Sequence, residues 1–216
     1  MELGYWSIKG RAEPIRLMLA LFKVDYKEVN PKSRKAFKES SKQLGLKFTN
    51  LPYLIDGDKK ISESTVIPYY IAWKLNKTDF FGKPGSEDVE HRMLMGVLLD
   101  MHQVIIEVMF RPDLEVIWEF KKDFMAAKTE ELSGFLGSKE FFLGHVTYAD
   151  LLYFVNYEAG EQLTRALGVP SFFENYANLQ ALKKRIGELD GIKQYLESDP
   201  RAKRIFVPSN LVKPKL

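Results

Sequence analysis

Residues that could bind a charged ligand concentrate between Asn50 and Ser64, where a tight turn, a carboxylate and a hydroxyl follow one another. Ser64 is a good N-cap for a helix expected over 65–76, and free backbone N–H groups at such a terminus favour a carboxylate or phosphate. Glu63 beside it can hold an ammonium group. The pair therefore suits a zwitterionic head, such as the α-amino and α-carboxylate groups of an amino acid. A capped helix beside a solvent-exposed acid explains the same pattern.

A second polar group lies at the end of the first expected strand, Leu3–Ser7. The Tyr5 hydroxyl can donate a hydrogen bond to an anion, and Arg11 can add positive charge. Strand ends beside helix N-termini are common ligand sites in folds that mix helices and sheets. In isolation, core positions for Tyr5 and Trp6 are the simpler explanation.

Leu51-Pro52, just before another strand, is a candidate cis peptide bond. Such a bond would turn the backbone N–H and C=O of Leu51 toward a peptide ligand. Asn50 and Arg34 could then reach the far end of that ligand, although Arg34 is also one of many solvated bases between Lys32 and Lys47.

Two acids of the C-terminal half have different expected roles. Asp100 is the lone acid of the apolar stretch Leu98–His102, so we expect it to meet a partner, either an arginine or a ligand amine. Asp150 stands three residues after Thr147, which is the spacing of a capping box, and we assign it a folding role.

The elements that position these residues change in type near residue 80. Strands and helices alternate before it, and the order βαβαββα predicts an α+β unit over residues 1–80. A linker is expected over 81–86 and an all-α domain over 87–216. Apolar residues at helical spacing predict helices over 89–109, 114–136, 148–167 and 179–187.

Composition limits the possible functions of the 216 residues. No apolar run approaches the roughly 20 residues of a membrane span, and no signal peptide is evident, so we expect a cytoplasmic protein. Zero cysteines exclude disulfides, cysteine–metal sites and thiol chemistry by the protein. The net charge of +3 does not argue for nucleic acid, and the three scattered histidines predict no metal site.

Taken together, these segments resemble the cytosolic glutathione transferases, most closely their mu class. The resemblance runs over essentially the whole chain and rests on Leu3–Ala12, Leu44–Gly57, Ile61–Ser64, Asp100–His102, Phe110–Asp113 and Val146–Asp150. It implies a thioredoxin-like first domain and an all-α second domain, with the tripeptide glutathione bound between them.

The resemblance also implies roles for single residues. Tyr5 matches the residue whose hydroxyl stabilises the glutathione thiolate, and Leu51, before a cis Pro52, matches the backbone partner of the cysteinyl unit. Glu63 and Ser64 match the γ-glutamyl contacts, with Asp100 approaching from a second subunit. The remaining implied positions are Trp6, Arg34, Phe37, Asn50 and either Lys42 or Ser41 for glutathione, His102 and Phe110 for the electrophile site, and Phe48 as the aromatic key of a homodimer.

The chain departs from the mu-class pattern in the loop before Arg34, which is several residues shorter and could open the electrophile site, and at Ser41, where a lysine is expected and Lys42 follows one place on. Four further residues also differ. Arg11 replaces an aliphatic residue and is a candidate second stabiliser of the thiolate. Glu63 replaces a glutamine, and a carboxylate is at least as good a partner for an ammonium group. Phe37 stands where a tryptophan is usual, and Phe110 where a tyrosine that assists epoxide opening is common.

We therefore expect a glutathione S-transferase that conjugates glutathione to small hydrophobic electrophiles in detoxification. Glutathione is then a co-substrate, and we expect no cofactor, metal, nucleic-acid or membrane partner. Two alternatives keep the same fold: a non-catalytic ligand-binding or structural member, and a glutathione-dependent prostaglandin isomerase.

Overall fold

The computed structural model describes residues 1–111 and 113–206, which form two compact units. The first unit joins Met1–Thr78 to Asp190–Phe206, and the second contains Asp79–Leu189. The division after Thr78 lies close to the linker expected over 81–86. The C-terminal helices differ from the expectation for 87–216, because they pack with the first unit.

A four-stranded mixed sheet forms the centre of the first unit, in the order β2-β1-β3-β4. Its strands are β1 (Glu2–Gly4), β2 (Lys27–Val29), β3 (Tyr53–Asp56) and β4 (Lys59–Ser62). β1 is parallel to β2 and antiparallel to β3, and β3 and β4 pair as an antiparallel hairpin. Gly57 in the hairpin turn has a φ of 61°, which confirms the predicted reversal.

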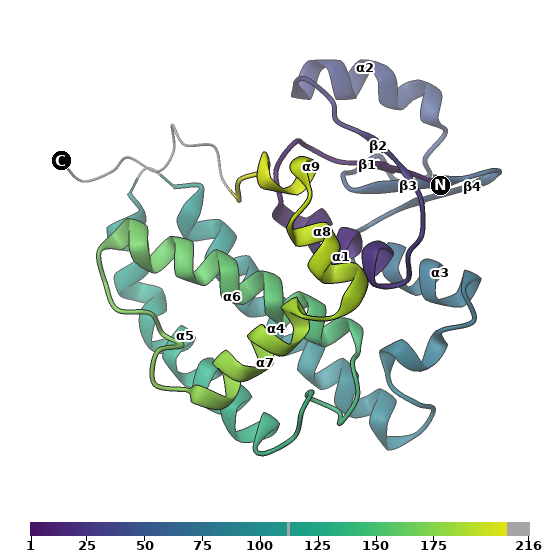
Figure 1. Cartoon of the computed structure of the whole chain (residues 1–216). Helices are drawn as coiled ribbons and strands as arrows, with labels where there is room; N and C mark the ends of the chain where they lie inside the picture. Colours follow the sequence, from purple (N-terminus) through teal and green to yellow (C-terminus); the bar gives the residue numbers. More distant parts are fainter. Residues whose placement is uncertain (112, 207–216) are drawn as a thin grey trace. The chain divides into compact units, whose positions relative to one another are not determined.

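Helices cover both faces of this sheet: α2 lies on one side, and α1 and α3 lie on the other (Figure 1). The helices of this unit are the 3₁₀ turn η1 (Gly10–Ala12), α1 (Glu13–Leu21), α2 (Arg34–Leu44), α3 (Ile67–Lys74), α8 (Asp190–Leu196) and α9 (Asp199–Ala202). The order βαβαββα and the α+β class are therefore confirmed.

Sequence periodicity did not indicate that the chain returns to the first unit after Leu189. α8 packs closely on the end of α1, since a Cβ atom added at Gly191 would lie 2.0 Å from the Ala20 carbonyl oxygen. An ion pair of 2.6 Å between Lys23 Nζ and Asp190 Oδ2 lies beside this contact.

The second unit is helical, as predicted. After the 3₁₀ turn η2 (Thr78–Phe81) it contains α4 (Ser86–Met109), α5 (Leu114–Leu136), α6 (Tyr148–Leu167) and α7 (Ala177–Gly187). α6 packs against α4 and α7, and its N-terminus has the predicted capping box of Thr147 and Asp150. Within the described ranges, no helix has an apolar stretch long enough to cross a membrane.

Candidate functional site

Tyr5 directly follows β1 and lies in the segment that leads into η1. Its side chain is buried, and its hydroxyl oxygen accepts a hydrogen bond of 3.1 Å from the backbone N–H of Arg11. Gly10 makes this approach possible, because its φ of 43° lies in the left-handed region and a Cβ atom there would lie 2.7 Å from the Tyr5 oxygen. The glycine in Lys9-Gly10-Arg11 was the available sequence signal for this close approach.

Burial raises the pKa of Tyr5, while the Arg11 backbone N–H and the charges of Arg11 and Arg16 act in the opposite direction. The hydroxyl therefore keeps its proton at neutral pH. Since the oxygen already accepts from Arg11, the proton is available for donation to an anion, and the accepted bond polarises the hydroxyl further. The arrangement can stabilise a thiolate.

Apolar and aromatic side chains surround Tyr5. The rings of Trp6 and Phe37 meet edge to face at 6.1 Å, and Phe37 stacks on Tyr53 at 6.5 Å. Leu51 belongs to the same cluster as Tyr5 and Tyr53. The structure thus brings three expected glutathione contacts, Trp6, Phe37 and Leu51, around the Tyr5 side chain.

The Leu51–Pro52 peptide bond is cis, as the resemblance implied. The backbone N–H of Leu51 donates to the Asn50 side-chain oxygen at 2.9 Å, and the Asn50 amide nitrogen donates to Glu63 Oε1 at 3.0 Å. Asn50 therefore joins the segment expected to bind the cysteinyl unit to the segment expected to bind the γ-glutamyl head.

The prediction that Ser64 is the N-cap of a helix starting at Thr65 is wrong. Glu63 has a φ of 77°, and its carbonyl oxygen accepts from the N–H groups of Val66 and Ile67, each at 3.0 Å. An extra turn therefore precedes α3, which begins at Ile67 with Val66 as its N-cap. No described residue accepts a hydrogen bond from the backbone N–H of Ser64, so this group can still bind an anion.

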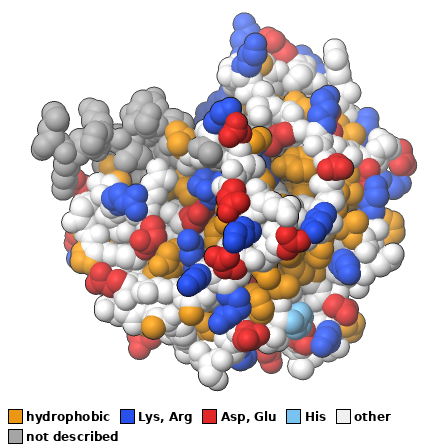
Figure 2. Space-filling model, in the orientation of Figure 1, with side chains coloured by type: hydrophobic (Ala, Val, Ile, Leu, Met, Phe, Trp, Pro, Cys, Tyr) orange, Lys and Arg blue, Asp and Glu red, His pale blue; other side chains and the backbone are white. Residues whose placement is uncertain are grey.

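The helix α2 is strongly basic on its exposed side. Arg34 and Lys42 are exposed, and Glu39 is the single acid of the helix. Figure 2 shows Lys and Arg side chains at the upper end of the molecule, where α2 lies. Ser41 is buried instead, and its hydroxyl donates to the Lys38 carbonyl oxygen. Of the two candidates Lys42 and Ser41, only Lys42 has an exposed side chain.

Site candidates of the second unit lie in different environments. Asp100 is exposed on α4 and forms no ion pair with a described residue. Phe110 is half-exposed, at 40%, directly after α4. His102 is buried, and its Nδ1 lies 2.7 Å from Asn156 Oδ1, while Asn156 donates to the Leu98 carbonyl. We correct the expectation for His102, because its helical position directs it into the core rather than to an electrophile.

Two further groups that support Tyr5 were not predicted from the sequence. Asn30 donates from its amide nitrogen to the Tyr5 carbonyl at 2.9 Å. Arg16 is fully buried, and its guanidinium carbon lies 5.8 Å from the centre of the Tyr5 ring. An arginine inside the apolar stretch Pro14–Leu19 was the available signal, because a charge there needs buried partners. Among the described residues, no group of three His, Cys, Asp or Glu side chains could hold a metal ion.

This fold is that of a glutathione transferase. The family model for the glutathione S-transferase N-terminal domain matches residues 1–73, and the model for the C-terminal domain matches residues 99–199. The chain belongs to the glutathione S-transferase family.

Named relatives include members of the mu class. Glutathione S-transferase 2 of Gallus gallus is 34% identical over 209 residues, which covers 92% of this chain and 90% of the relative. The class-mu 26 kDa isozyme of Schistosoma japonicum is 35% identical over 202 residues, covering 91% and 88%. The crystal structure of the glutathione S-transferase Blo t 8 has the same fold, with a TM-score of 0.83, 23% identity and full coverage of both chains.

Proposed function

We propose that this protein conjugates the glutathione thiolate to small hydrophobic electrophiles, as a detoxifying enzyme. The observation that carries the proposal is the buried Tyr5 hydroxyl, which accepts from the Arg11 backbone and keeps its own proton for donation. The electrophile is attacked directly by the thiolate, so the reaction needs no covalent intermediate with the protein. Glutathione is the co-substrate.

The energy required from the site is modest. A free thiol has a pKa of about 8.5, so only a few per cent is ionised at neutral pH. Lowering this pKa by about two units requires about 2.7 kcal/mol of preference for the anion. A hydrogen bond to a charged group contributes about 1.5–3 kcal/mol, so Tyr5 can supply most of it. Arg11, exposed beside the hydroxyl, is the candidate for the remainder.

The other contacts follow the chemistry of the tripeptide. The Leu51 backbone pairs with the cysteinyl unit, for which Asn50 must release the Leu51 N–H that it now occupies. Glu63 meets the γ-glutamyl ammonium, and the N–H and hydroxyl of Ser64 meet its carboxylate. At the glycyl end, the aromatic pair of Trp6 and Phe37 supports the backbone, and Arg34 and Lys42 bind the carboxylate.

We further propose that two copies of the chain form a homodimer. Phe48 is 72% exposed in the segment between α2 and β3, which is unusual for a phenylalanine without a partner surface. On α4, Val89 and Met93 are also exposed, at 56% and 68%, and Asp100 lies on the same helix. Burying these apolar side chains against a second copy would bring Asp100 to the partner's γ-glutamyl amine.

The proposal is tested by Tyr5→Phe, which removes one oxygen and keeps the ring. We expect conjugation of an aryl halide to fall about 100-fold, the rate equivalent of about 2.7 kcal/mol, while the protein is still retained on immobilised glutathione. Tyr53→Phe is the matched control, since its hydroxyl contacts Glu2 on the neighbouring strand instead. Equal turnover by Tyr5→Phe and the wild type would remove Tyr5 from the mechanism.

A further inference from the structure

A network of buried charges runs through the first unit and includes Arg16, the arginine that lies beside the Tyr5 ring. Glu13 and Arg16 of α1 are fully buried. The Arg16 guanidinium donates to Glu13 Oε2 at 3.1 Å and to Glu28 Oε1 at 2.6 Å. Buried ion pairs contribute little net stability compared with apolar packing. The contacts that its members make indicate a specific structural role for this network.

Arg16 connects the network to the segment that carries Tyr5. Its Nη1 atom donates to the backbone carbonyls of Ile8 and Lys9, at 3.0 and 3.1 Å. Tyr5 precedes this segment, and Gly10 and Arg11, which support the Tyr5 hydroxyl, follow it. The guanidinium therefore holds the middle of the loop whose two ends determine the position of that hydroxyl.

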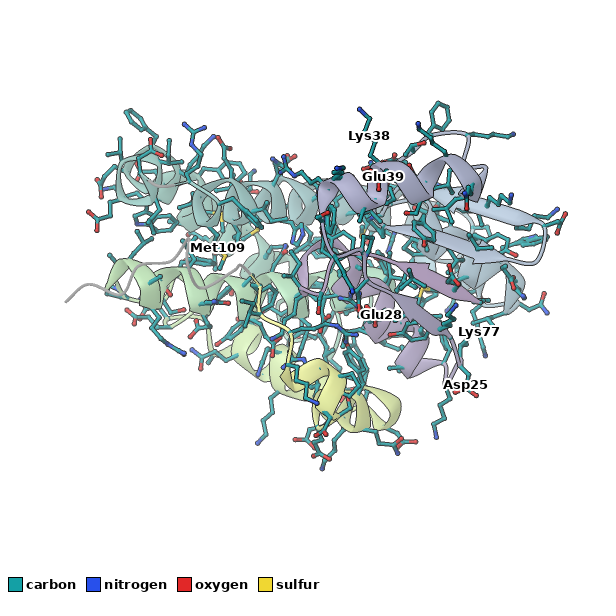
Figure 3. All side chains as sticks on the ribbon, turned by 90° about the horizontal axis from the view of Figure 1, so that it is seen from above. Asp25, Glu28, Lys38, Glu39, Lys77 and Met109 are labelled. Carbon is teal, nitrogen blue, oxygen red and sulfur yellow. The ribbon has the colours of Figure 1, made fainter. Side chains whose placement is uncertain are left out.

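Glu28 connects the network to a second segment that contacts the Tyr5 backbone. Figure 3 shows Glu28 inside the unit, whereas Lys38 projects outward from α2. Asn30, two residues after Glu28, places its amide nitrogen 2.9 Å from the Tyr5 carbonyl and 3.4 Å from Glu28 Oε1. The backbone N–H of Tyr5 donates to Val29 at 3.0 Å. The Glu28–Asn30 segment thus fixes the Tyr5 backbone.

Two residues of the C-terminal segment Asp190–Phe206 bind the acids of the network. Arg204, which is buried, donates to Glu28 Oε2 and lies 3.4 Å from the Tyr195 hydroxyl. The Tyr195 hydroxyl donates in turn to Glu13 Oε2 at 3.1 Å.

The residue after Arg204 reaches the loop directly. The Ile205 carbonyl accepts from the backbone N–H of Lys9 at 2.9 Å, so the C-terminal segment binds both the network and the loop.

We propose that Arg204 is a positioning residue for Tyr5, acting through Glu28 and Arg16 to hold the Tyr5–Arg11 loop in its hydrogen-bonding geometry. This inference rests on the proposed role of Tyr5. A small displacement of the hydroxyl weakens its bond to the thiolate, whereas the proposed partners of the charged ends of glutathione, namely Glu63, Ser64, Arg34 and Lys42, lie outside this loop. Loss of Arg204 should therefore lower kcat and leave the KM for glutathione nearly unchanged.

The test compares Arg204→Met with Lys203→Met, which removes an exposed cation from the adjacent position. We expect Arg204→Met to lower kcat about tenfold. At saturating glutathione, the pH profile of kcat/KM for the electrophile should shift toward higher pH by about one unit, since less of the bound thiol is then ionised at neutral pH. Lys203→Met should match the wild type. Arg204→Lys, which restores a cation opposite Glu28, should recover part of the rate.

A second comparison separates positioning from general destabilisation. In a Tyr5→Phe background the hydroxyl is absent, so Arg204→Met should have almost no further effect on kcat. An equal tenfold loss in both backgrounds overturns the inference, and so does an unshifted pH profile in the single variant. If Arg204→Met does not fold, Tyr195→Phe, which deletes one hydroxyl from the network, takes its place with the same pH shift expected.

The outcomes also distinguish the two proposals. If Tyr5→Phe has a lowered kcat and Arg204→Met has the kcat of the wild type, only the positioning role is overturned. Unimpaired Tyr5→Phe overturns the assignment of Tyr5, and the positioning role with it.

Discussion

Gly10→Ala should disable the proposed site through a single methyl group. The added Cβ atom would lie 2.7 Å from the Tyr5 oxygen and 3.0 Å from its ring carbon Cε1. Real Cβ atoms do not approach an oxygen this closely, so the phenol must move. If the displaced hydroxyl loses its bond to the thiolate, worth about 1.5–3 kcal/mol, kcat falls about 10- to 150-fold.

The same substitution has a second cost that must be measured separately. The left-handed φ of 43° at Gly10 disfavours any residue with a Cβ atom, by about 1–2 kcal/mol of folding stability. Gly57→Ala is the matched control, because its φ is 61° and no described atom lies within 4 Å of its added Cβ. The control should lose similar stability in a denaturant titration and keep its kcat.

Two measurements separate the displaced hydroxyl from the loss of stability. They are the steady-state kcat for conjugation of an aryl halide at saturating glutathione, and thermal denaturation of each variant. Loss of kcat in Gly10→Ala alone supports the steric argument. If both variants lose stability and both keep kcat, the position of the Tyr5 hydroxyl does not limit turnover, and the reasoning is refuted.

Three other predictions concern stability and assembly. Burial lowers the pKa of His91 to about 4 from about 6.5 in the unfolded chain, so its stabilising effect is complete above pH 6.5 and is lost as the pH falls toward 4. In urea titrations, the free energy of unfolding should fall by about 2 kcal/mol less in His91→Phe than in the wild type when the pH is lowered from about 7.5 to about 5. An equal fall in both proteins would contradict this. Phe48→Ser should weaken the homodimer about 30-fold or more, as expected for an interface hot spot, and an unaltered sedimentation profile would refute the aromatic key. Thr147→Ala should lower the free energy of unfolding by about 1 kcal/mol, because it removes the capping-box hydroxyl that bonds to Asp150, and a denaturant midpoint equal to that of the wild type would exclude the cap.

Local patterns were sufficient to predict most of the fold. The helix expected over 148–167 has the observed bounds of α6, because its capping box and apolar periodicity are both local signals. The hairpin at Gly57 was predictable for the same reason. The return of Asp190–Phe206 to the first unit was not, since the contacts of Gly191 and Arg204 join residues far apart in sequence.

The candidate site shows the same limit, since local sequence patterns predicted some of its residues and not others. Tyr5 and Leu51 were predicted as site residues from their place beside expected strands and from the family pattern, and the structure places both in one cluster. The Ser64 cap was mispredicted because the left-handed backbone of Glu63 leaves no mark in residue type. His102 follows Leu98 by one helical turn, and Leu98 is fully buried, so its helical phase already pointed into the core. The resemblance had favoured a ligand role instead.

The most direct test of the central claim is a pH titration of the thiolate absorbance of glutathione bound to the wild type and to Tyr5→Phe. We expect a bound thiol pKa about two units below the free value of about 8.5 in the wild type, and a rise of more than about one unit toward 8.5 in the variant. Equal, lowered pKa values in both proteins would show that another group stabilises the thiolate and would refute the proposed role of Tyr5.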